Sequence, residues 1–226
     1  MKTTFFGLLV LSCALSVSAI DKAELDNRIR TLTAKFDALQ QQSGKAIPAD
    51  TLRKAQGIVL LDRTKAGFIF AYQGGGGVAL ARDKAGKWGP AAFLSASEAS
   101  LGFQIGGEQA FYVILLMNTN ATRMLTDSKF DFGGEARGTA GDQSGGAEGK
   151  VTPTEPAVLV YDDRKGLYGG AVIKGGAISP DHKANEVYYG QSWSMHDILI
   201  EKQVKTTETA AALAAKITAY SKPPKK

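Results

Sequence analysis

Four consecutive glycines, Gly74 to Gly77, form the first stretch that could do chemistry, because glycine-rich loops hold phosphate through backbone N–H groups. A Walker loop also needs Gly-Lys-Ser/Thr at its end, and a dinucleotide-binding loop needs a following helix. Here Val78-Ala79-Leu80 follows, which favours a strand. The segment from Gly102 to Gly106 fails in the same way. We therefore expect the glycine run to mark a bend or bulge in a sheet.

Acid–base and metal chemistry would have to use the two histidines, His182 and His196, which stand in different segments. The run Ser194-Met-His-Asp197 contains the residue types of a catalytic triad, but sequence neighbours on a helix or strand point apart. It reads better as a helix start, with Ser194 as N-cap and Asp197 in the capping-box position. No cluster has metal-ligand spacing. We expect no enzyme, cofactor or metal site, unless His196 lies beside a carboxylate in a deep pocket.

Basic residues cluster in the predicted turns between strands. Two turns carry the candidate lipid-binding residues, which are Arg63, Lys65, Arg82, Lys84, Lys87 and Trp88. Arg164 and Lys165 occupy a related later turn. If the turns share an edge, they form a cationic rim with an aromatic that can enter a lipid headgroup layer. The alternative is a set of unrelated, solvated turns.

The first 19 residues have the features of a signal peptide. Met1-Lys2 gives a positive start, Phe5 to Val17 is apolar but too short to span a bilayer, and Val17-Ser-Ala19 places small residues before a cleavage site. A lipoprotein signal that uses Cys13 is the alternative, although Leu11 fits it poorly. We therefore expect an exported protein, periplasmic or extracellular, able to associate peripherally with a membrane.

Cleavage after Ala19 would remove Cys13, the only cysteine, so the mature chain could form neither a disulfide nor a thiolate site. It would keep 26 basic and 22 acidic residues, after the loss of Lys2 from the 27 of the full chain. This mild positive charge suits an anionic membrane surface. It is too low for nucleic acid to be an expected partner, and no aromatic-rich RNA-binding motif is present.

A first helix is predicted over Asp21–Gln42, within an N-terminal amphipathic segment at 20–44. Its apolar residues recur at spacings of four and three and make one stripe, consisting of Leu25, Ile29, Leu32, Phe36 and Leu39. The stripe could dock on the core, bind a partner helix, or lie in a membrane interface. A closing helix is predicted over Glu208–Tyr220.

From Gly57 onward, short apolar runs alternate with turn signals about every ten residues, which is typical of antiparallel β-structure. Similar residues also recur one hundred positions apart, where 57–62 matches 157–162 and Val78 matches Ile178. The predicted fold class is α+β, with an antiparallel β-rich body flanked by N- and C-terminal helices. The body is expected to be a barrel or sandwich, with two related β units as one option.

The ordered segments resemble the SYLF domain family, a lipid-binding or actin-regulator domain family. The resemblance covers residues 45–221 and leaves 222–226 as a tail. Its matching segments are 55–59, 65–68, 74–82, Trp88-Gly-Pro90, 102–107, 113–118, 165–170 and Tyr188-Tyr-Gly190. The sequence departs from many relatives at Trp88-Gly-Pro90, where they have Trp-Ser-x-Pro, and at Gly141-Asp142, where a Gly-Pro is common.

The resemblance implies binding rather than catalysis. Intracellular eukaryotic relatives bind phosphoinositide membranes through an amphipathic segment and basic residues, and some contact actin filaments. We therefore expect binding to anionic, phosphoinositide-like membrane surfaces through the basic turns and the amphipathic helix. The alternative is a cell-envelope protein-interaction module that binds a partner through the N-terminal helix.

Overall fold

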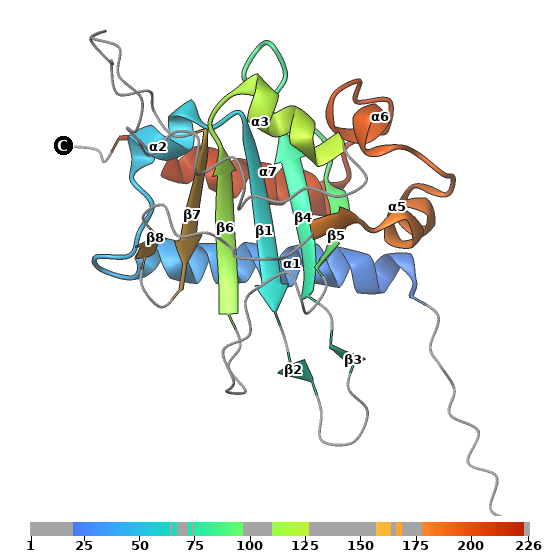
Figure 1. Cartoon of the computed structure of the whole chain (residues 1–226), viewed down its shortest axis with the longest axis horizontal. Coiled ribbons are helices and arrows are strands. Elements are labelled where there is room, and N and C mark those ends of the chain that lie inside the picture. The colour runs from blue at the N-terminus through green and yellow to red at the C-terminus, as the bar shows by residue number, and fades with distance from the viewer. Residues whose placement is uncertain are drawn as a thin grey trace, which may run out of the picture.

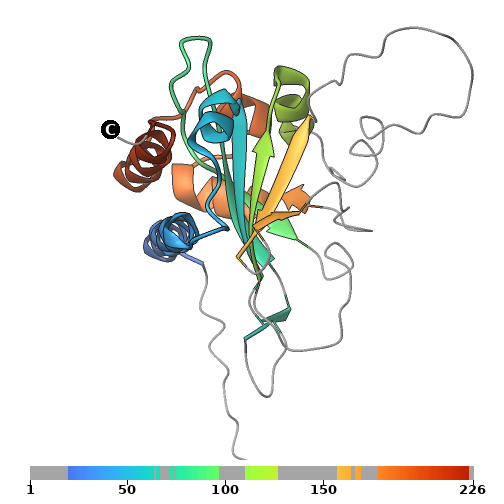
Figure 2. The ribbon, with the colours of Figure 1, turned by 90° about the vertical axis from the view of Figure 1, so that its left-hand side faces the viewer.

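The computed structural model describes residues 20–63, 65–66, 72–73, 75–96, 110–126, 157–163, 166–168 and 178–223. In these ranges a central sheet lies between two groups of helices (Figures 1 and 2), which confirms the predicted α+β class. The proposed signal peptide at 1–19 and the end of the tail at 224–226 lie outside the described residues.

The central sheet has seven strands in the order β8-β7-β6-β1-β4-β5-β9, and each neighbouring pair is antiparallel. The strands are β1 (Gly57–Arg63), β4 (Gly75–Ala81), β5 (Ala92–Ala96), β6 (Ala110–Leu116), β7 (Val158–Asp162), β8 (Gly166–Tyr168) and β9 (Ile178–Pro180). A separate two-stranded ribbon pairs β2 (Lys65–Ala66) with β3 (Tyr72–Gln73).

Helices cover both faces of this sheet (Figure 2). The first face packs against α1 (Lys22–Gln41), α2 (Ala49–Lys54), α5 (His182–Tyr189) and α7 (Glu208–Tyr220). The second face packs against α3 (Thr119–Arg123), the 3-10 helix η2 (Met124–Thr126) and α6 (Met195–Leu199). The closing helix α7 spans Glu208–Tyr220, the range that was predicted for it.

The central strands are buried on both faces. In β1, Ile58 and Leu60 face the α1 side while Val59 and Leu61 face the α6 side, and all are 0% exposed. Each fully buried aliphatic side chain of this size contributes about 1.5–3 kcal/mol relative to exposure. The sheet therefore builds two cores, which explains why its strands read as continuous apolar runs.

The apolar stripe of α1 is part of the first core. All five of its residues are at most 1% exposed, namely Leu25, Ile29, Leu32, Phe36 and Leu39. Asp21 caps the helix by accepting a hydrogen bond from the Glu24 N–H at 2.8 Å. Docking on the core is confirmed, so the stripe is not available to a membrane or to a partner helix while α1 is docked.

The expected barrel or sandwich is wrong. Among the described strands, β8 and β9 lie at opposite edges of one sheet and do not pair with each other. Helices, rather than a second sheet, cover both faces. Short antiparallel strands suggested a closed or doubled sheet because antiparallel sheets often leave one face to solvent. Here neither face of the central strands is left to solvent.

The arrangement of two related β units is also not found. Val78 lies on β4, which pairs with β1, whereas the matching Ile178 lies on β9 at the far edge of the sheet from β7. The repeated residues therefore do not form two equivalent strand pairs within the described chain.

The glycine run neither bends nor bulges the sheet over Gly75–Gly77, because Gly76 and Gly77 pair in register with both β1 and β5, and Gly75 continues the register with β5. Close packing explains two of the glycines. A Cβ at Gly77 would lie 2.7 Å from the Leu60 carbonyl oxygen, and one at Gly76 would lie 3.3 Å from the Arg28 guanidinium. At Gly76 and Gly77 the strand packs too closely against β1 and Arg28 to carry side chains. The expected bend is therefore wrong, and no phosphate cradle is formed there.

A polar network joins α1, α5 and α7. The Asp26 carboxylate accepts hydrogen bonds from Lys22 at 2.7 Å, Thr209 at 2.6 Å and Tyr188 at 2.7 Å, and Thr207 also bonds the Tyr188 hydroxyl. Burial alone would raise the pKa of Asp26, but these hydrogen bonds outweigh it and lower the pKa to about 2.

The buried side-chain amide of Asn185 forms two hydrogen bonds with the backbone of Phe93 in β5. Asn185 is 1% exposed, accepts the Phe93 N–H at 2.8 Å and donates to the Phe93 carbonyl at 3.1 Å. The Asp181 N–H also donates to that carbonyl, at 3.0 Å. The Phe93 N–H therefore relies on Asn185 as its hydrogen-bond acceptor, whereas the Phe93 carbonyl has a second donor in the Asp181 N–H.

We predict that Asn185→Ala lowers the free energy of unfolding by about 1–3 kcal/mol, because it leaves the buried Phe93 N–H without an acceptor. Urea denaturation measures this loss. Asn27→Ala, at an exposed position on α1, is the matched control and should change stability by less than about 0.5 kcal/mol. Equal effects of the two substitutions would contradict the assigned role of Asn185.

We predict that Asp26→Asn destabilises the fold at pH 7 by about 1–2 kcal/mol, a value reduced for the partial exposure of the carboxylate. The folded pKa of about 2 lies below the ordinary value of 3.8 in the unfolded chain, so this stabilisation is present above about pH 4 and is lost as pH falls through 2. The stability difference from wild type should therefore shrink between pH 4 and pH 2. A constant difference over that range, measured by urea denaturation, would refute the assignment.

Candidate functional site

The hairpin that joins β4 to β5 projects from one end of the sheet (Figure 1). Hydrogen bonds within the loop fix its conformation. Asp83 accepts the Lys87 N–H on its side chain at 2.8 Å and the Gly86 N–H on its carbonyl at 2.9 Å, and Gly86 has a φ of 78°. The side chains of Lys84 and Lys87 are exposed on this loop. It is the hairpin loop that the sequence predicts.

Arg82 ties the hairpin to the body. Its guanidinium donates to the carbonyls of Ala55 at 2.8 Å, Gly86 at 2.5 Å and Leu52 at 3.4 Å. Burial lowers the pKa of Arg82 from its ordinary value. Because these carbonyls take three of its five N–H donors, Arg82 positions the loop and is less available to a headgroup than Lys84 or Lys87.

Trp88 is 5% exposed and belongs to the first core. The Arg82 guanidinium carbon lies 4.2 Å from the centroid of its ring, a cation–π contact. The expected role of Trp88 as an aromatic that enters the headgroup layer is therefore wrong, because the indole is already covered by the protein.

Arg63 and Lys65 lie at the other end of the sheet from the hairpin. In the β1–β4 pairing, Gly57 is opposite Ala81 and Asp62 is opposite Gly76, so β1 carries the chain away from Arg82. At about 3.3 Å per residue, the two turns are about 20 Å apart. The expected shared cationic rim is therefore wrong. The side chains of Arg63 and Lys65, and residues 164–165, lie outside the described part of the structure.

Two further basic residues lie near the hairpin, and sequence patterns gave no sign of either. Arg123 comes from α3 and Lys202 from the segment after α6, and both line a cleft of about 600 Å³ beside Asp83 and Lys84. Burial lowers the pKa of Lys202, and the charge of Asp83 partly offsets this. A second groove, of about 520 Å³, runs between the other side of the hairpin and α7.

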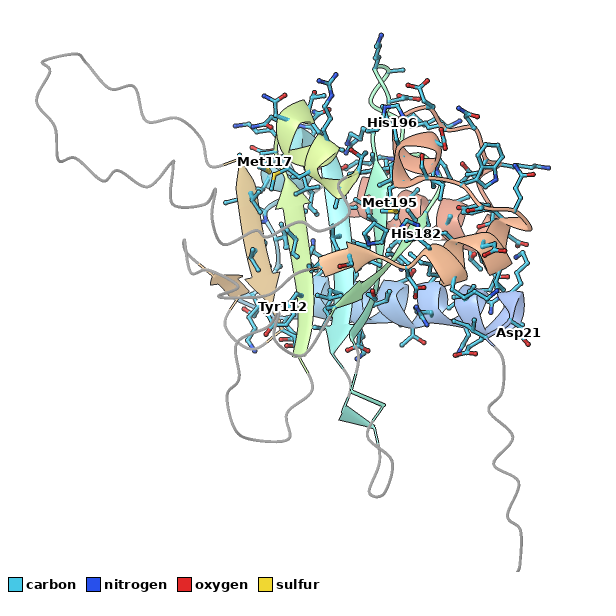
Figure 3. All side chains as sticks on the ribbon, turned by 45° about the vertical axis from the view of Figure 1, so that its right-hand side comes forward. Asp21, Tyr112, Met117, His182, Met195 and His196 are labelled. Atoms are coloured by element: carbon cyan, nitrogen blue, oxygen red, sulfur yellow. The ribbon has the colours of Figure 1, made fainter. Side chains whose placement is uncertain are left out.

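The histidines do not form a catalytic site. Figure 3 shows His182 and His196 on separate elements, α5 and α6. The His196 Nε2 atom lies 3.9 Å from a Glu201 carboxylate oxygen, and both side chains are 54% exposed. Ser194 and Asp197 form the predicted capping box of α6. Among the described residues, no group of three His, Cys, Asp or Glu side chains could hold a metal ion.

None of the helices in the described ranges combines the length and the apolar character that crossing a bilayer requires.

Comparison with known proteins gives one consistent family. The Ysc84 family, described as "Las17-binding protein actin regulator", matches residues 97–220. LAS seventeen-binding protein 3 of Saccharomyces cerevisiae is 30% identical over 159 residues, which are 69% of this chain and 35% of that protein. SH3 domain-containing YSC84-like protein 1 of Homo sapiens is 30% identical over 169 residues, which are 73% of this chain and 49% of that protein.

The matched segment thus spans about a third of the yeast relative and about half of the human one. The family match covers more than half of this chain, and both relatives share their identity over more than two thirds of it. The chain therefore belongs to the Ysc84 family, whose domain is the SYLF domain that the sequence resembles.

Proposed function

We propose that this chain is a non-catalytic binding module that attaches to anionic membrane surfaces through its β4–β5 hairpin. One observation carries the proposal. The β4–β5 loop projects beyond the sheet (Figure 1). Lys84 and Lys87 are exposed on it, and neither ammonium lies in an ion pair within the described part of the chain. The exposed Arg123 of α3 lies beside the same end of the molecule.

The proposed contact is electrostatic. A basic side chain next to an anionic lipid surface contributes about 1 kcal/mol, so three of them give weak, reversible attachment. The apolar elements that could anchor the chain more firmly, Trp88 and the stripe of α1, are buried in the first core. Binding should therefore weaken steeply with salt, because added ions screen exposed charges beyond about 10 Å at 0.1 M.

Export is a separate part of the proposal. The signal-peptide features of residues 1–19 support export of the mature chain to the periplasm or the outside of the cell, where it would meet a membrane from its non-cytoplasmic side. The natural targets there are anionic phospholipids in general, rather than the cytoplasmic phosphoinositides that the resemblance implies.

Binding to a protein is the second candidate function, and the family match favours it. The family is described as an actin regulator, and the yeast relative is named for binding LAS seventeen. In this chain such a partner would have to contact the polar face of α1 or the hairpin end, because the apolar stripe of α1 is already buried.

We predict that the mature chain pellets with vesicles that contain anionic phospholipid and not with neutral vesicles. The double variant Lys84→Glu/Lys87→Glu should bind at least tenfold more weakly, because the hairpin then repels the surface. Co-sedimentation at about 0.02–0.05 M salt measures the bound fraction of each variant, and raising the salt to about 0.3 M should release the wild type from the vesicles.

The control variant is Arg30→Glu/Lys183→Glu, which makes the same change in net charge at exposed positions on α1 and α5. It should bind nearly as well as wild type if the hairpin is the contact. Equal weakening in both double variants would show that only net charge matters and would remove the hairpin from the proposal.

The protein-binding candidate gives a different result in the same kind of experiment. It predicts that the mature chain pellets with actin filaments in the absence of any lipid. Pelleting with filaments and not with anionic vesicles would replace the lipid proposal. Pelleting with vesicles alone would reject actin as the partner.

A further inference from the structure

The cleft beside the hairpin is built from segments that are far apart in the sequence. The hairpin supplies Asp83 and Lys84, α3 supplies Thr119 and Arg123, and the segment after α6 supplies Lys202. The volume of about 600 Å³ is in the range of pockets that hold small ligands. The cleft therefore shares Lys84 with the tip of the hairpin, but it extends from the hairpin to α3 and to the segment after α6.

Lys202 has an unusual backbone conformation. Its φ of 53° makes it the one non-glycine residue with positive φ in the described ranges. A residue with a Cβ is strained in this conformation, and such strain concentrates at functional positions. The preceding turn is held by the Ile200 and Glu201 N–H groups, which both donate to the His196 carbonyl. The strain is thus maintained by the capped helix α6.

The side chain of Lys202 crosses the base of the hairpin. A Cβ on Gly89 would lie 2.8 Å from the Lys202 Cε atom, so the absence of a side chain there lets the lysine stem pass. The side chain is only 20% exposed. The ammonium group is therefore carried into a partly desolvated position, where an unsatisfied charge is costly.

The partners of this ammonium are poor. The Lys202 Nζ atom donates to the Lys87 carbonyl at 3.5 Å and lies 4.0 Å from an Asp83 carboxylate oxygen. Both distances are long for a charged donor, whose hydrogen bonds are normally about 2.7–2.9 Å. Asp83 is moreover engaged by the Lys87 N–H at 2.8 Å through its other oxygen. Lys202 therefore has donor capacity for a further anionic ligand.

The rest of the cleft has excess positive charge. Its basic residues are Arg82, Lys84, Arg123 and Lys202, and its acidic residues are Asp83 and Glu201. The Glu201 carboxylate lies 3.9 Å from the His196 Nε2 atom, and 54% of its side chain is exposed. Neither Lys84 nor Arg123 lies in an ion pair within the described chain. A dianion would bring the charge of the cleft close to balance.

We propose that this cleft binds a phosphate group, with the Lys202 ammonium at its centre and Arg123 and Lys84 at its rim. A phosphate dianion offers acceptor oxygens in several directions, which suits donors that converge from the hairpin, α3 and the segment after α6. The group belongs either to a soluble phosphomonoester or to the exposed headgroup of a lipid. The lipid source rests on the proposed function, whereas the phosphate site does not.

The test begins with inorganic phosphate, titrated at pH 7.5 into the ¹⁵N-labelled mature chain, with chloride at matched ionic strength as the reference. Phosphate should shift the backbone amide signals of 83–84, 119–123 and 200–203 in a saturable manner. Lys202→Gly should weaken this binding at least tenfold. Glycine accepts the positive φ, so this variant loses the ammonium without a backbone penalty.

Lys205→Gly is the matched control, because it removes the same charge at an exposed position nearby. It should leave the phosphate affinity within about twofold of wild type. Arg123→Gln, at an exposed position that poses little risk to the fold, should weaken binding severalfold. The site is overturned if phosphate gives no saturable shifts, or if Lys202→Gly and Lys205→Gly have equal effects.

Vesicles separate the two sources of phosphate. Phosphatidic acid carries a terminal phosphomonoester, whereas phosphatidylglycerol carries only a diester. Preference for phosphatidic acid at equal surface charge, lost in Lys202→Gly, supports a lipid source. Phosphate binding without binding to either vesicle supports a soluble source and rejects the membrane function. Equal binding to both vesicles without phosphate shifts overturns the cleft and leaves the membrane function standing.

Discussion

The central strands β1, β4 and β6 carry apolar side chains on both faces, and covering both faces organises the rest of the structure. An antiparallel sheet usually needs only one protected face. Here α1 and α7 cover one face and α3 and α6 the other (Figure 2). The amphipathic helix that could otherwise have met a membrane is required inside the protein, because without it β1 and β4 would lose the cover of one face.

This double burial also restricts where binding can occur. With the faces of the central strands covered, the remaining accessible parts of these strands are the loops at their ends. The β4–β5 hairpin is one such loop, and Arg82 fixes its position while the Lys202 stem packs across its base. Arg82 holds it to carbonyls at the end of α2, and Lys202 crosses its base from the segment after α6. A loop fixed in this way presents Lys84 and Lys87 in one orientation, which lowers the entropy lost when they meet a charged surface.

Local patterns in the sequence predicted the elements well. The spacing of Leu25 to Leu39 predicted α1, Ser194 and Asp197 predicted the cap of α6, and the short apolar runs after Gly57 indicated antiparallel strands. These features depend on residues close together in the chain. The order of the strands does not, and the mistaken barrel or sandwich follows from that. No residue in β9 indicates that it pairs with β5 rather than with β7. Helix α5 was missed because its apolar residues are few and its sequence contains adjacent tyrosines.

The candidate site shows the same division. A strand about every ten residues would place two strands between the turn at Arg63 and the turn at Lys84, and alternation would then put both turns at one end of the sheet. In the structure β2 and β3 form a separate ribbon and β1 pairs directly with β4, so the two turns lie at opposite ends. The burial of Trp88 was less accessible to sequence reasoning. The bridge between Arg82 and Trp88 sets which way the indole points, and this depends on the length and register of the hairpin loop.

Lys202 could not have been found from sequence at all, because its importance arises from a contact across 115 residues with the carbonyl of Lys87. Residues that act through such contacts carry no local pattern. An exposed lysine and a lysine whose side chain passes over a glycine into a cleft look alike in the sequence, but they differ in the free energy of binding an anion. The ammonium of the first is fully hydrated and gains little from binding any one anion. The ammonium of the second is partly desolvated and has only long contacts to the protein, so it gains more binding free energy from an anion that enters the cleft.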